Sequence, residues 1–360
     1  MAPQARVVPG RFAAAVTVLA TFACGGDGPT TPVSESPDLS CSIPESRIFN
    51  GQVKDGIPAL TDPARVTVSS PDAQYLKPGD RVIGLRTGGT FLAVPLNILW
   101  WHEIVNVDVD GRRLAITHCP LTGSSLAFDR AAAGGAEFGV SGLLYQNNLI
   151  MYDRTTDQSL WPQMVRGARC GSQDGTPLSM VPVVEMTWQG WLTLHPGTEV
   201  IGSATGFERD YDVYPYGDYD RIDNPELLFP QPDLDRRRPP KERVLGIPDG
   251  SGGGVAYPFG ELAEVGLAAA VAASDHVVFW DGNREGAMAY RPEVDGQALR
   301  FGVAGDVIRD EQTGSTWTLD GMAVDGPLAG RSLSPVAEAY VAFWFAWAAF
   351  QPGAALWEAP

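Results

Sequence analysis

The sequence predicts a mainly β protein with a minor α component, built from two homologous β-rich domains that arose by internal duplication. Three observations lead to this fold class. The 360 residues include 41 Gly and 29 Pro, a content that favours turns and short strands over long helices. Short runs of alternating apolar residues recur between turn signals. A set of motifs also appears twice in the same order, which indicates an internal duplication.

Composition and charge restrict the class of partner. The chain carries 26 basic and 43 acidic residues, a net charge of −17 at neutral pH. Nucleic-acid affinity comes mainly from clustered Lys and Arg that release counterions, so no nucleic-acid partner is expected. With 44% apolar and 19% charged residues, the composition is that of a folded globular protein.

The N-terminus predicts export. Residues 1–23 contain Arg6 and Arg11, followed by an uninterrupted small and apolar run at 12–23, which is the order of a secretory signal peptide. The run ends at a small residue followed by Cys24, and this arrangement resembles a bacterial lipoprotein signal with Cys24 as the lipidated residue. An ordinary cleaved signal is the alternative. Both interpretations predict export, and as a lipoprotein the protein is expected in the bacterial cell envelope, facing the periplasm or the surface.

A tether is expected to follow the signal. Residues 24–49 are rich in Gly, Ser, Thr and Pro and predict a flexible link between the lipid anchor and the folded part. The most apolar later stretch, residues 337–350, contains Glu338 and stops before Pro352. We therefore expect membrane contact only through the N-terminal lipid.

The internal repeat defines the predicted domains. The run RVIGL at residues 81–85 returns as RVLGI at 243–247. Further motif pairs follow in the same order, at 93–96 and 256–259, 138–140 and 301–303, 159–161 and 315–317, and 188–197 and 344–353. We expect a first repeat domain at 50–202, a Tyr-, Asp- and Pro-rich connector at 203–237, and a second repeat domain at 238–360.

Within each repeat, short strands are expected. Alternating apolar residues at 105–109 and 114–116 flank Asp110-Gly111, a hairpin signal. A second strand pair is expected at 125–129 and 138–140, with another strand at 149–152. One helix near the end of each repeat is predicted, at 186–194 and 336–350, each stopped by Pro. The matched Trp residues are expected to fill equivalent cores.

Potential chemistry is concentrated in the first repeat. His102, His118, Cys119 and His195 align with Val265, Trp280, Asp281 and Gln351 in the second repeat. Imidazole and thiolate groups suit copper or zinc, so His102, Cys119 and His195 are candidate metal ligands. Their spacing matches no compact metal motif, and buried structural roles for His102 and Cys119 are the alternative. The leading hypothesis is a small polar site around His102, Glu103 and Cys119.

Two other functional classes stay open. One is a Cys-dependent enzyme, with Cys119 activated by His102 or His118 and oriented by Glu103 or Asp108. The other is a non-catalytic surface binding or scaffold protein. Neighbouring residues of a strand point to opposite faces, so His118 and Cys119 are not expected to enter one site unless the strand ends there.

The remaining cysteines and an acidic run have structural interpretations. Cys41 and Cys170 could pair in an oxidising compartment, with Cys119 able to replace either one. The acidic residues of the connector could offer oxygen ligands to calcium, but their spacing is not that of an EF-hand and favours a solvated turn region; they are Asp210, Asp212, Asp218, Asp220 and Asp223.

Several motifs together resemble an exported bacterial family known as the domain of unknown function numbered 3179. They run in order over nearly the whole mature chain: DGIPAL at 55–60, PLNILWWHEIVN at 95–106, CPLTGS at 119–124, FGVSGLLY at 138–145, MYDR at 151–154, SLW at 159–161, His195-Pro196, RDY at 209–211 and KERV at 241–244. The resemblance implies an exported, often lipid-anchored protein and no established activity. Thr122 replaces the second Cys of the family's CPLCG pattern, and Val107 replaces the last Asp of HEIVND. If the family's chemistry needs both thiols, this member is inactive.

Overall fold

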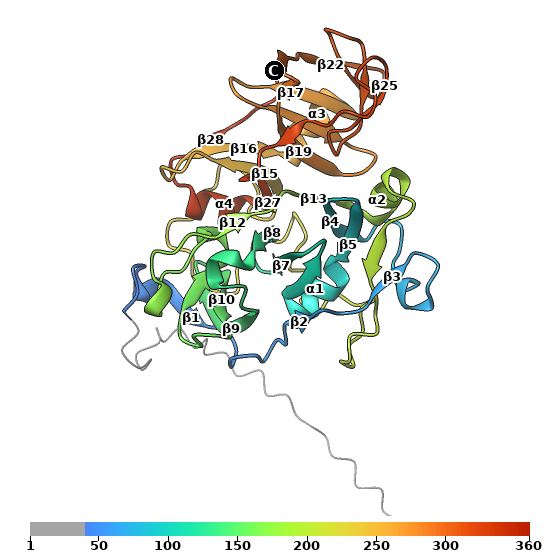
Figure 1. Ribbon diagram of the computed structural model, residues 1–360. Coiled ribbons are helices and arrows are strands. Elements are labelled where there is room, and N and C mark those ends of the chain that lie inside the picture. The colour runs from blue at the N-terminus through green and yellow to red at the C-terminus, as the bar shows by residue number, and fades with distance from the viewer. Residues whose placement is uncertain (1–39) are drawn as a thin grey trace, which may run out of the picture. The chain divides into compact units, whose positions relative to one another are not determined.

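The computed structural model describes residues 40–360, whose strands form six sheets with four short α-helices between them (Figure 1). The predicted class, mainly β, is confirmed. The expected signal peptide at 1–23 and the lipidation site at Cys24 lie outside the described residues. No helix within residues 40–360 has the length and apolar character needed to cross a membrane.

The first half is built on a five-stranded sheet of order β13-β4-β5-β14-β3. Its strands are β3 (Arg65–Thr67), β4 (Arg81–Thr87), β5 (Thr90–Pro95), β13 (Val183–Thr187) and β14 (Glu199–Ile201). Neighbouring strands are antiparallel except for β14, which lies parallel to β5. Trp191, from the helix that follows β13, packs against Gly84 of β4 so closely that an added Cβ would lie 2.3 Å from the indole ring.

A nine-stranded sheet contains strands of both halves. Its main order is β2-β6-β7-β8-β27-β15-β16-β28, and β12 pairs with β8. The strands are β2 (Leu60–Thr61), β6 (Ile104–Val109), β7 (Arg112–Cys119), β8 (Ser124–Asp129), β12 (Ser179–Met180), β15 (Arg243–Pro248), β16 (Gly254–Pro258), β27 (Tyr340–Phe343) and β28 (Ala355–Leu356). Val341 of β27 pairs with Ser125 of β8, and this contact joins the two halves.

Four smaller sheets complete the β structure. In the first half, β1-β9-β10-β11 comprises β1 (Ile48–Asn50), β9 (Phe138–Tyr145), β10 (Asn148–Asp153) and β11 (Leu160–Pro162). In the second half, β17-β18-β19-β26 comprises β17 (Ala268–Ala272), β18 (Val277–Asp281), β19 (Gly286–Arg291) and β26 (Ser334–Pro335). The other two sheets contain β20 (Glu293–Val294) with β21 (Gln297–Ala298), and β22 (Phe301–Ala304), β23 (Val307–Asp310), β24 (Thr316–Trp317) and β25 (Ala323–Asp325).

The four helices have seven residues each: α1 (Leu96–His102), α2 (Trp188–Leu194), α3 (Phe259–Val265) and α4 (Trp344–Phe350). The predicted helices at 186–194 and 336–350 begin too early, because Val183–Thr187 and Tyr340–Phe343 pair as strands. A continuous apolar run carries no period that separates a buried strand from a helix. Helix α1 was not predicted for the same reason, and the short helix α3, which contains Glu261 and Glu264, was not predicted either. Short 3-10 helices lie at Glu45–Arg47, Pro71–Ala73, Arg130–Ala133, Gln163–Val165 and Gly171–Gln173.

The predicted hairpin is confirmed, but the second predicted strand pair is wrong. Strands β6 and β7 turn through Asp110 and Gly111, with φ values of 50° and 76° that fit a tight hairpin turn. Strand β8, in contrast, pairs with β7, β12 and β27, while β9 pairs with β1 and β10. A 3-10 turn capped by Asp129 separates β8 from β9, so strands adjacent in sequence enter different sheets.

The two halves share their local architecture. Strands β27-β15-β16 and the parallel strand β28 repeat the arrangement of β13-β4-β5 and β14. Trp347 of α4 packs on Gly246 of β15 as Trp191 packs on Gly84, with an added Cβ only 2.2 Å from the indole. The matched Trp side chains are buried, as expected. The origin of this arrangement by duplication, and the domain boundaries, stay predictions.

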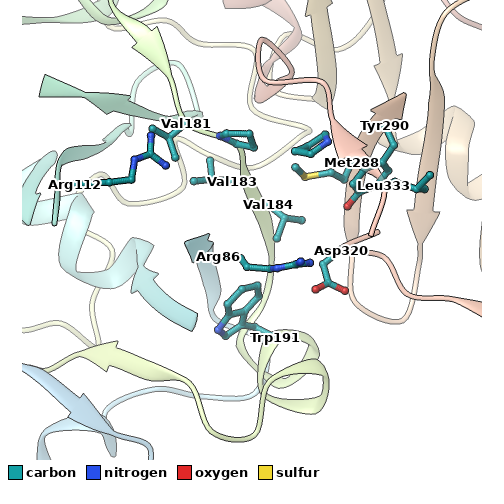
Figure 2. Close-up of a pocket in the computed structure, with 13 residues that line it drawn as sticks. Arg86, Arg112, Val181, Val183, Val184, Trp191, Met288, Tyr290, Asp320 and Leu333 are labelled. Atoms are coloured by element: carbon teal, nitrogen blue, oxygen red, sulfur yellow. The ribbon is translucent and has the colours of Figure 1, made fainter. Parts of the chain in front are cut away.

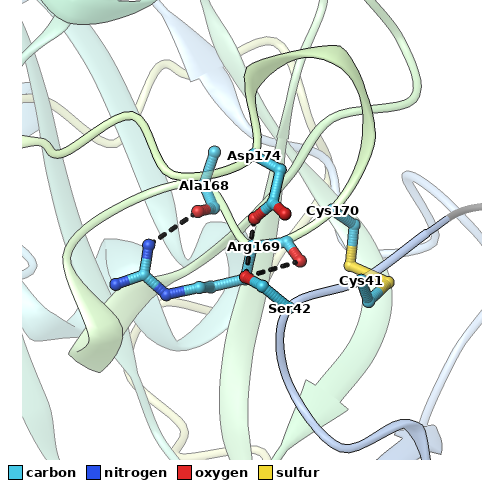
Figure 3. The surroundings of a disulfide bond; sticks show 6 residues. All are labelled: Cys41, Ser42, Ala168, Arg169, Cys170 and Asp174. Carbon is cyan, nitrogen blue, oxygen red and sulfur yellow. Dashed lines mark hydrogen bonds between the residues drawn. A yellow bond between two sulfur atoms is a disulfide. The ribbon is translucent and has the colours of Figure 1, made fainter.

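The N-terminal part of the predicted tether is attached to the first half. Cys41 and Cys170 form a disulfide, and Ser42 Oγ donates a hydrogen bond to the Asp174 carboxylate (Figure 3). Strand β1 then pairs with β9. The expected flexible link at 24–49 is therefore wrong for the residues from Cys41 onward. Cys119 is the free thiol within residues 40–360.

The connector contains no helix or strand between Ile201 and Arg243, yet it is held firmly by polar contacts. Tyr219 Oη donates to the Leu121 carbonyl at 2.9 Å. The buried Lys241 ammonium donates to the carbonyls of Tyr219 and Glu226 at 2.7 and 2.8 Å. Most of the connector's acidic residues are exposed to solvent, as favoured from the sequence, but Asp220 is half-buried.

Candidate functional site

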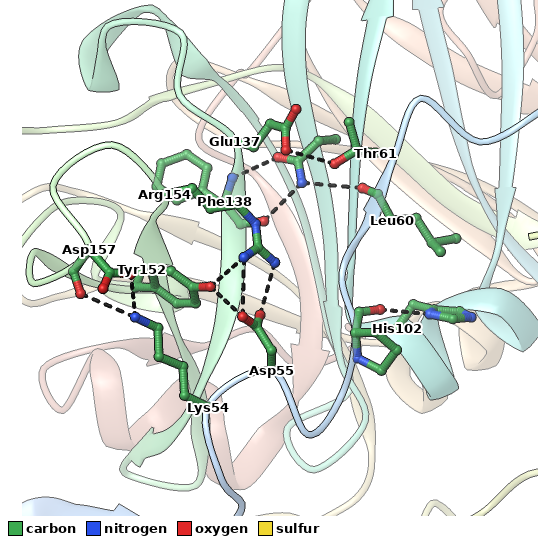
Figure 4. A network of polar contacts seen from close by, with 12 residues as sticks. Lys54, Asp55, Leu60, Thr61, His102, Glu137, Phe138, Tyr152, Arg154 and Asp157 are labelled. Atoms are coloured by element: carbon green, nitrogen blue, oxygen red, sulfur yellow. Dashed lines mark hydrogen bonds and ion pairs between the residues drawn. The ribbon is translucent and has the colours of Figure 1, made fainter. Parts of the chain in front are cut away.

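His102, at the end of α1, holds three segments together. Its Nδ1 lies 2.7 Å from the Pro58 carbonyl, and its Nε2 lies 2.7 Å from Tyr211 Oη. Figure 4 labels His102 and shows its neighbours on the side of Asp55. Burial lowers the pKa of His102 to about 4, so the ring is neutral near pH 7. Both ring nitrogens already have protein partners, which leaves neither one for a metal ion in this arrangement.

Figure 4 also shows a cluster next to this contact that fixes the segment leading to Pro58. Asp55 accepts two hydrogen bonds from Arg154, at 2.9 and 3.1 Å, and one from Tyr152 Oη at 2.5 Å. The Lys54 ammonium lies 3.9 Å from the centre of the Tyr152 ring. The DGIP motif therefore serves to anchor the chain beside α1.

Glu103 and Cys119 are buried near each other. Glu103 follows α1 with a φ of 56°, and burial raises the pKa of its carboxyl to about 8. Burial, with the nearby Glu103 charge, raises the pKa of the Cys119 thiol to about 11. Cys119 Sγ contacts the Asn147 carbonyl at 3.8 Å. A nucleophilic cysteine needs thiolate character, so this geometry does not support the hypothesis of a Cys-dependent enzyme.

His195 lies elsewhere, where the two halves meet. Its ring stacks on Phe91 at 4.1 Å, and its Nε2 is 3.1 Å from Asp320 Oδ2 of the second half. Asp320 lines a cavity of about 220 Å³ with mostly apolar walls, and Arg86 extends toward it (Figure 2). His195 thus lies against the second half through a close approach of its Nε2 to Asp320 Oδ2.

The structure does not bring the predicted metal ligands together. Among residues 40–360, no three His, Cys, Asp or Glu side chains are placed to hold one metal ion. His102 is bound by Pro58 and Tyr211, Cys119 lies in an apolar core, and His195 faces Asp320. His102, Cys119 and His195 therefore do not converge in this structure, and copper or zinc binding by these residues stays a prediction.

The residue that faces a polar cavity is His118, the strand neighbour of Cys119. As expected from strand geometry, the two point apart: Cys119 enters the core and His118 lines a cavity of about 240 Å³. We call this space the His118 cavity. Its walls come from both halves and the connector, and they include Asp80, Arg81, Trp100, His118, Tyr214, Asp220, Arg243, Glu285 and Phe343.

A hydrogen-bond relay fixes the tautomer of His118. Ser125 Oγ donates its proton to Glu185 Oε2 at 2.5 Å. Because its one proton is used in this way, Ser125 Oγ can only accept a hydrogen bond from His118 Nδ1, which lies 3.0 Å away. Nδ1 therefore carries the proton, and Nε2 presents a lone pair. Burial, opposed by Glu185, lowers the pKa of His118 to about 4, which keeps the ring neutral near pH 7.

Glu185 is ionised and shared by two arginines from matched positions of the two halves. Its Oε1 lies 2.6 Å from Arg81 Nε and 3.4 Å from Arg243 Nε. Burial works against ionisation, but the charges of Arg81 and Arg243 outweigh it and lower the pKa of Glu185 to about 2. Arg81 is also held by the side chain and carbonyl of Glu285. The terminal nitrogens of Arg243 make no hydrogen bond within residues 40–360.

Two other polar groups of the cavity also lack partners among the described residues. Tyr214 Oη is enclosed and makes no hydrogen bond. The Asp220 carboxylate lines the same cavity and forms no ion pair. Buried polar groups are usually paired, so the enclosed Tyr214 hydroxyl, together with the free groups of Asp220 and Arg243, makes this cavity a candidate site for a polar ligand.

Sequence reasoning missed most of these residues. The pair Arg81 and Arg243 was visible in the repeat, but only as part of its register. No pattern connected His118 with Glu185, because the contact depends on the pairing of β7 with β8 and on the approach of β13. The one sequence signal for this cavity was that His118 occurs in the first repeat, while the matched position of the second repeat holds Trp280.

Fold and cavity together define a mainly β protein of two joined halves with a polar site where both halves and the connector meet. The chain belongs to the family described as protein of unknown function (DUF3179), whose family model matches residues 54–354. Neither the curated proteins nor the solved structures that were compared with the chain give a match.

Proposed function

We propose that this protein is an exported, lipid-anchored binding protein of the bacterial cell envelope, and that its ligand occupies the His118 cavity. The observation that carries the proposal is the relay from Glu185 through Ser125 to His118. It leaves Nε2 of His118, a residue that lines the cavity, as a hydrogen-bond acceptor.

A fixed neutral imidazole can accept a hydrogen bond from a ligand without any change of protonation near pH 7. Holding the ring on Ser125 removes the alternative tautomer before a ligand arrives, which limits the entropy lost on binding. The cavity is smaller than most drug-sized sites, so the ligand is a small polar molecule. A site around His102, Glu103 and Cys119 receives less support, because its His nitrogens are occupied and its thiol is protonated.

Export is supported by the signal-like order of residues 1–23 and by Cys24 after the apolar run. The Cys41–Cys170 disulfide agrees with an oxidising compartment. Mass spectrometry of the mature N-terminal peptide tests this part. A diacylglycerol modification of Cys24 is expected, and release of Cys24→Ser from the membrane fraction should follow. An unmodified peptide that begins at another residue would contradict lipid anchoring.

The binding site is tested with two substitutions of His118. Asn places an amide nitrogen near the position of Nδ1, so His118→Asn keeps a donor for Ser125 and removes the acceptor at Nε2. His118→Gln instead places a polar group near Nε2. Thermal unfolding is measured with a panel of small anionic, cationic, zwitterionic and neutral metabolites, because a ligand that binds only the folded state raises the midpoint.

We expect at least one compound to stabilise the wild-type protein and to lose this effect with His118→Asn, with partial retention by His118→Gln. A ligand that stabilises the wild type and His118→Asn equally would place binding outside the His118 cavity. Absence of any stabilising compound in the panel would also count against the proposal.

A further inference from the structure

The His118 cavity contains opposite charges that are not paired with each other. Arg243 offers terminal N–H groups, and Asp220 offers a carboxylate, yet the two form no ion pair although both line the same space. We infer that the ligand is a zwitterion with one ammonium and one carboxylate group, of the size of an amino acid or a dipeptide. This inference rests on the proposed function and names the class of its ligand.

Arg243 is prepared to bind the carboxylate. Its guanidinium lies 5.7 Å from the centre of the Phe343 ring, and its Nε faces Glu185 at 3.4 Å. These contacts hold the planar group in place while its terminal nitrogens stay free, and a guanidinium can bind a carboxylate through two parallel hydrogen bonds. Arg81 is not equivalent, because its nitrogens are already bound to Glu185 and Glu285.

Other residues of the cavity lining suit an ammonium group. Asp220 supplies a negative charge, and His118 Nε2 supplies an acceptor that a protonated amine can donate to. Trp100 and Tyr214 also line the cavity, with their rings in an edge-to-face contact at 5.0 Å. Aromatic faces attract cations, which adds to the selection for a positively charged group.

Ligands of a single charge fit this lining less well. A simple anion would bind Arg243 but would face the carboxylates of Asp80, Asp220 and Glu285. A simple cation would leave the terminal nitrogens of Arg243 without a hydrogen-bond partner, because Arg243 meets Glu185 only through its Nε, at 3.4 Å. A zwitterion satisfies both groups at once, so the charges of the cavity select it over either class.

Isothermal titration calorimetry with the full mature protein tests the inference. The probes are L-alanine and L-alanyl-L-alanine, each compared with its N-acetyl derivative, which lacks the ammonium, and its amide, which lacks the carboxylate. We expect at least one of the two parent zwitterions to bind and both of its derivatives to bind about tenfold more weakly or worse, since hydrogen bonds to charged groups are among the strongest.

Two variants assign the charges. Arg243→Gln removes the group that binds the carboxylate, so this variant should no longer prefer the parent zwitterion over its amide. Asp220→Asn removes the group that binds the ammonium, so this variant should no longer prefer the parent over its N-acetyl derivative. Arg300→Gln and Asp306→Asn change exposed charges of the second half and should bind like the wild type.

Binding of a blocked derivative as tightly as its parent, or no binding of either parent, would overturn the inference. If another compound still binds in a His118-dependent manner, the proposed function stands while the ligand class is wrong. If none does, both fail.

Discussion

The first and second halves share a local strand arrangement but differ where the relay lies. His118, Ser125 and Glu185 stand in the first half, and the structurally matched positions of the second half hold Trp280, Ala287 and Val341. Strand pairing supports this match, because His118 pairs with Ser125 in β7 and β8, and Trp280 pairs with Ala287 in β18 and β19. Apolar residues therefore serve the same strands in the second half, which shows that this strand arrangement does not require the relay.

Other polar contacts occur in both halves with the same geometry. Asp153 accepts from Trp161 Nε1 at 2.9 Å, and Asp310 accepts from Trp317 Nε1 at 3.0 Å. In each case the carboxylate also accepts from the backbone and hydroxyl of a Thr three residues later. Contacts present in both halves are structural, and a contact present in one half is a candidate for function.

The largest change in the free energy of unfolding is expected from Glu185→Gln. Arg81 and Arg243 would lose their ionised partner in a buried setting, and unfolding in urea should show a loss of about 4 kcal/mol. The matched change Val341→Thr introduces one buried hydroxyl and should cost about 1 kcal/mol. Equal losses at the two positions would contradict the distinction between the halves.

The pH dependence of stability should come next in size. The pKa of His118 is lowered by burial from 6.5 to about 4, so the unfolded chain takes up a proton that the folded chain does not. The neutral, buried His118 therefore contributes to the free energy of unfolding in full above pH 6.5. About 3 kcal/mol of that contribution is lost as the pH falls from 6.5 through 4. Glu185, with a pKa lowered to about 2 from 4.5, adds a further loss below pH 4.5.

Glu103 acts in the opposite direction, because burial raises its pKa to about 8 and stability falls as pH rises from 4.5 to 8. The difference between wild type and His118→Asn isolates the His118 contribution. Urea unfolding at several pH values between 4 and 7.5 measures it. If both proteins show the same pH profile, His118 is not neutral in the folded state.

Asp153→Asn and Asp310→Asn are expected to lower the free energy of unfolding by the same amount, and by less than the changes above. Each change replaces a charged acceptor by an amide and weakens the bonds to Trp and Thr, at a cost of about 2 kcal/mol. Equilibrium unfolding in urea gives both values. A loss confined to one of the two variants would show that the matched contacts do not have equal structural importance.

The smallest effect is expected for His118→Asn at pH 7.5. The amide still donates to Ser125, so the change in unfolding free energy should stay below about 1 kcal/mol. Urea unfolding provides the value, and His118→Gln is the matched comparison. A loss of several kcal/mol would make the relay a structural element and remove the main support for a functional site.

The sequence by itself determined the mainly β class, the first hairpin, the buried Trp residues and the opposite orientation of His118 and Cys119. These follow from composition, turn chemistry and the two-residue period of a strand, all of which act over short distances along the chain. The pairing of β8 with β27 instead of β9 depends on contacts between distant segments. Only the tertiary structure decided that Glu185 pairs with Arg243 and is linked to His118 through Ser125. Strand pairing across the two halves brings these residues together, and no local pattern records that approach.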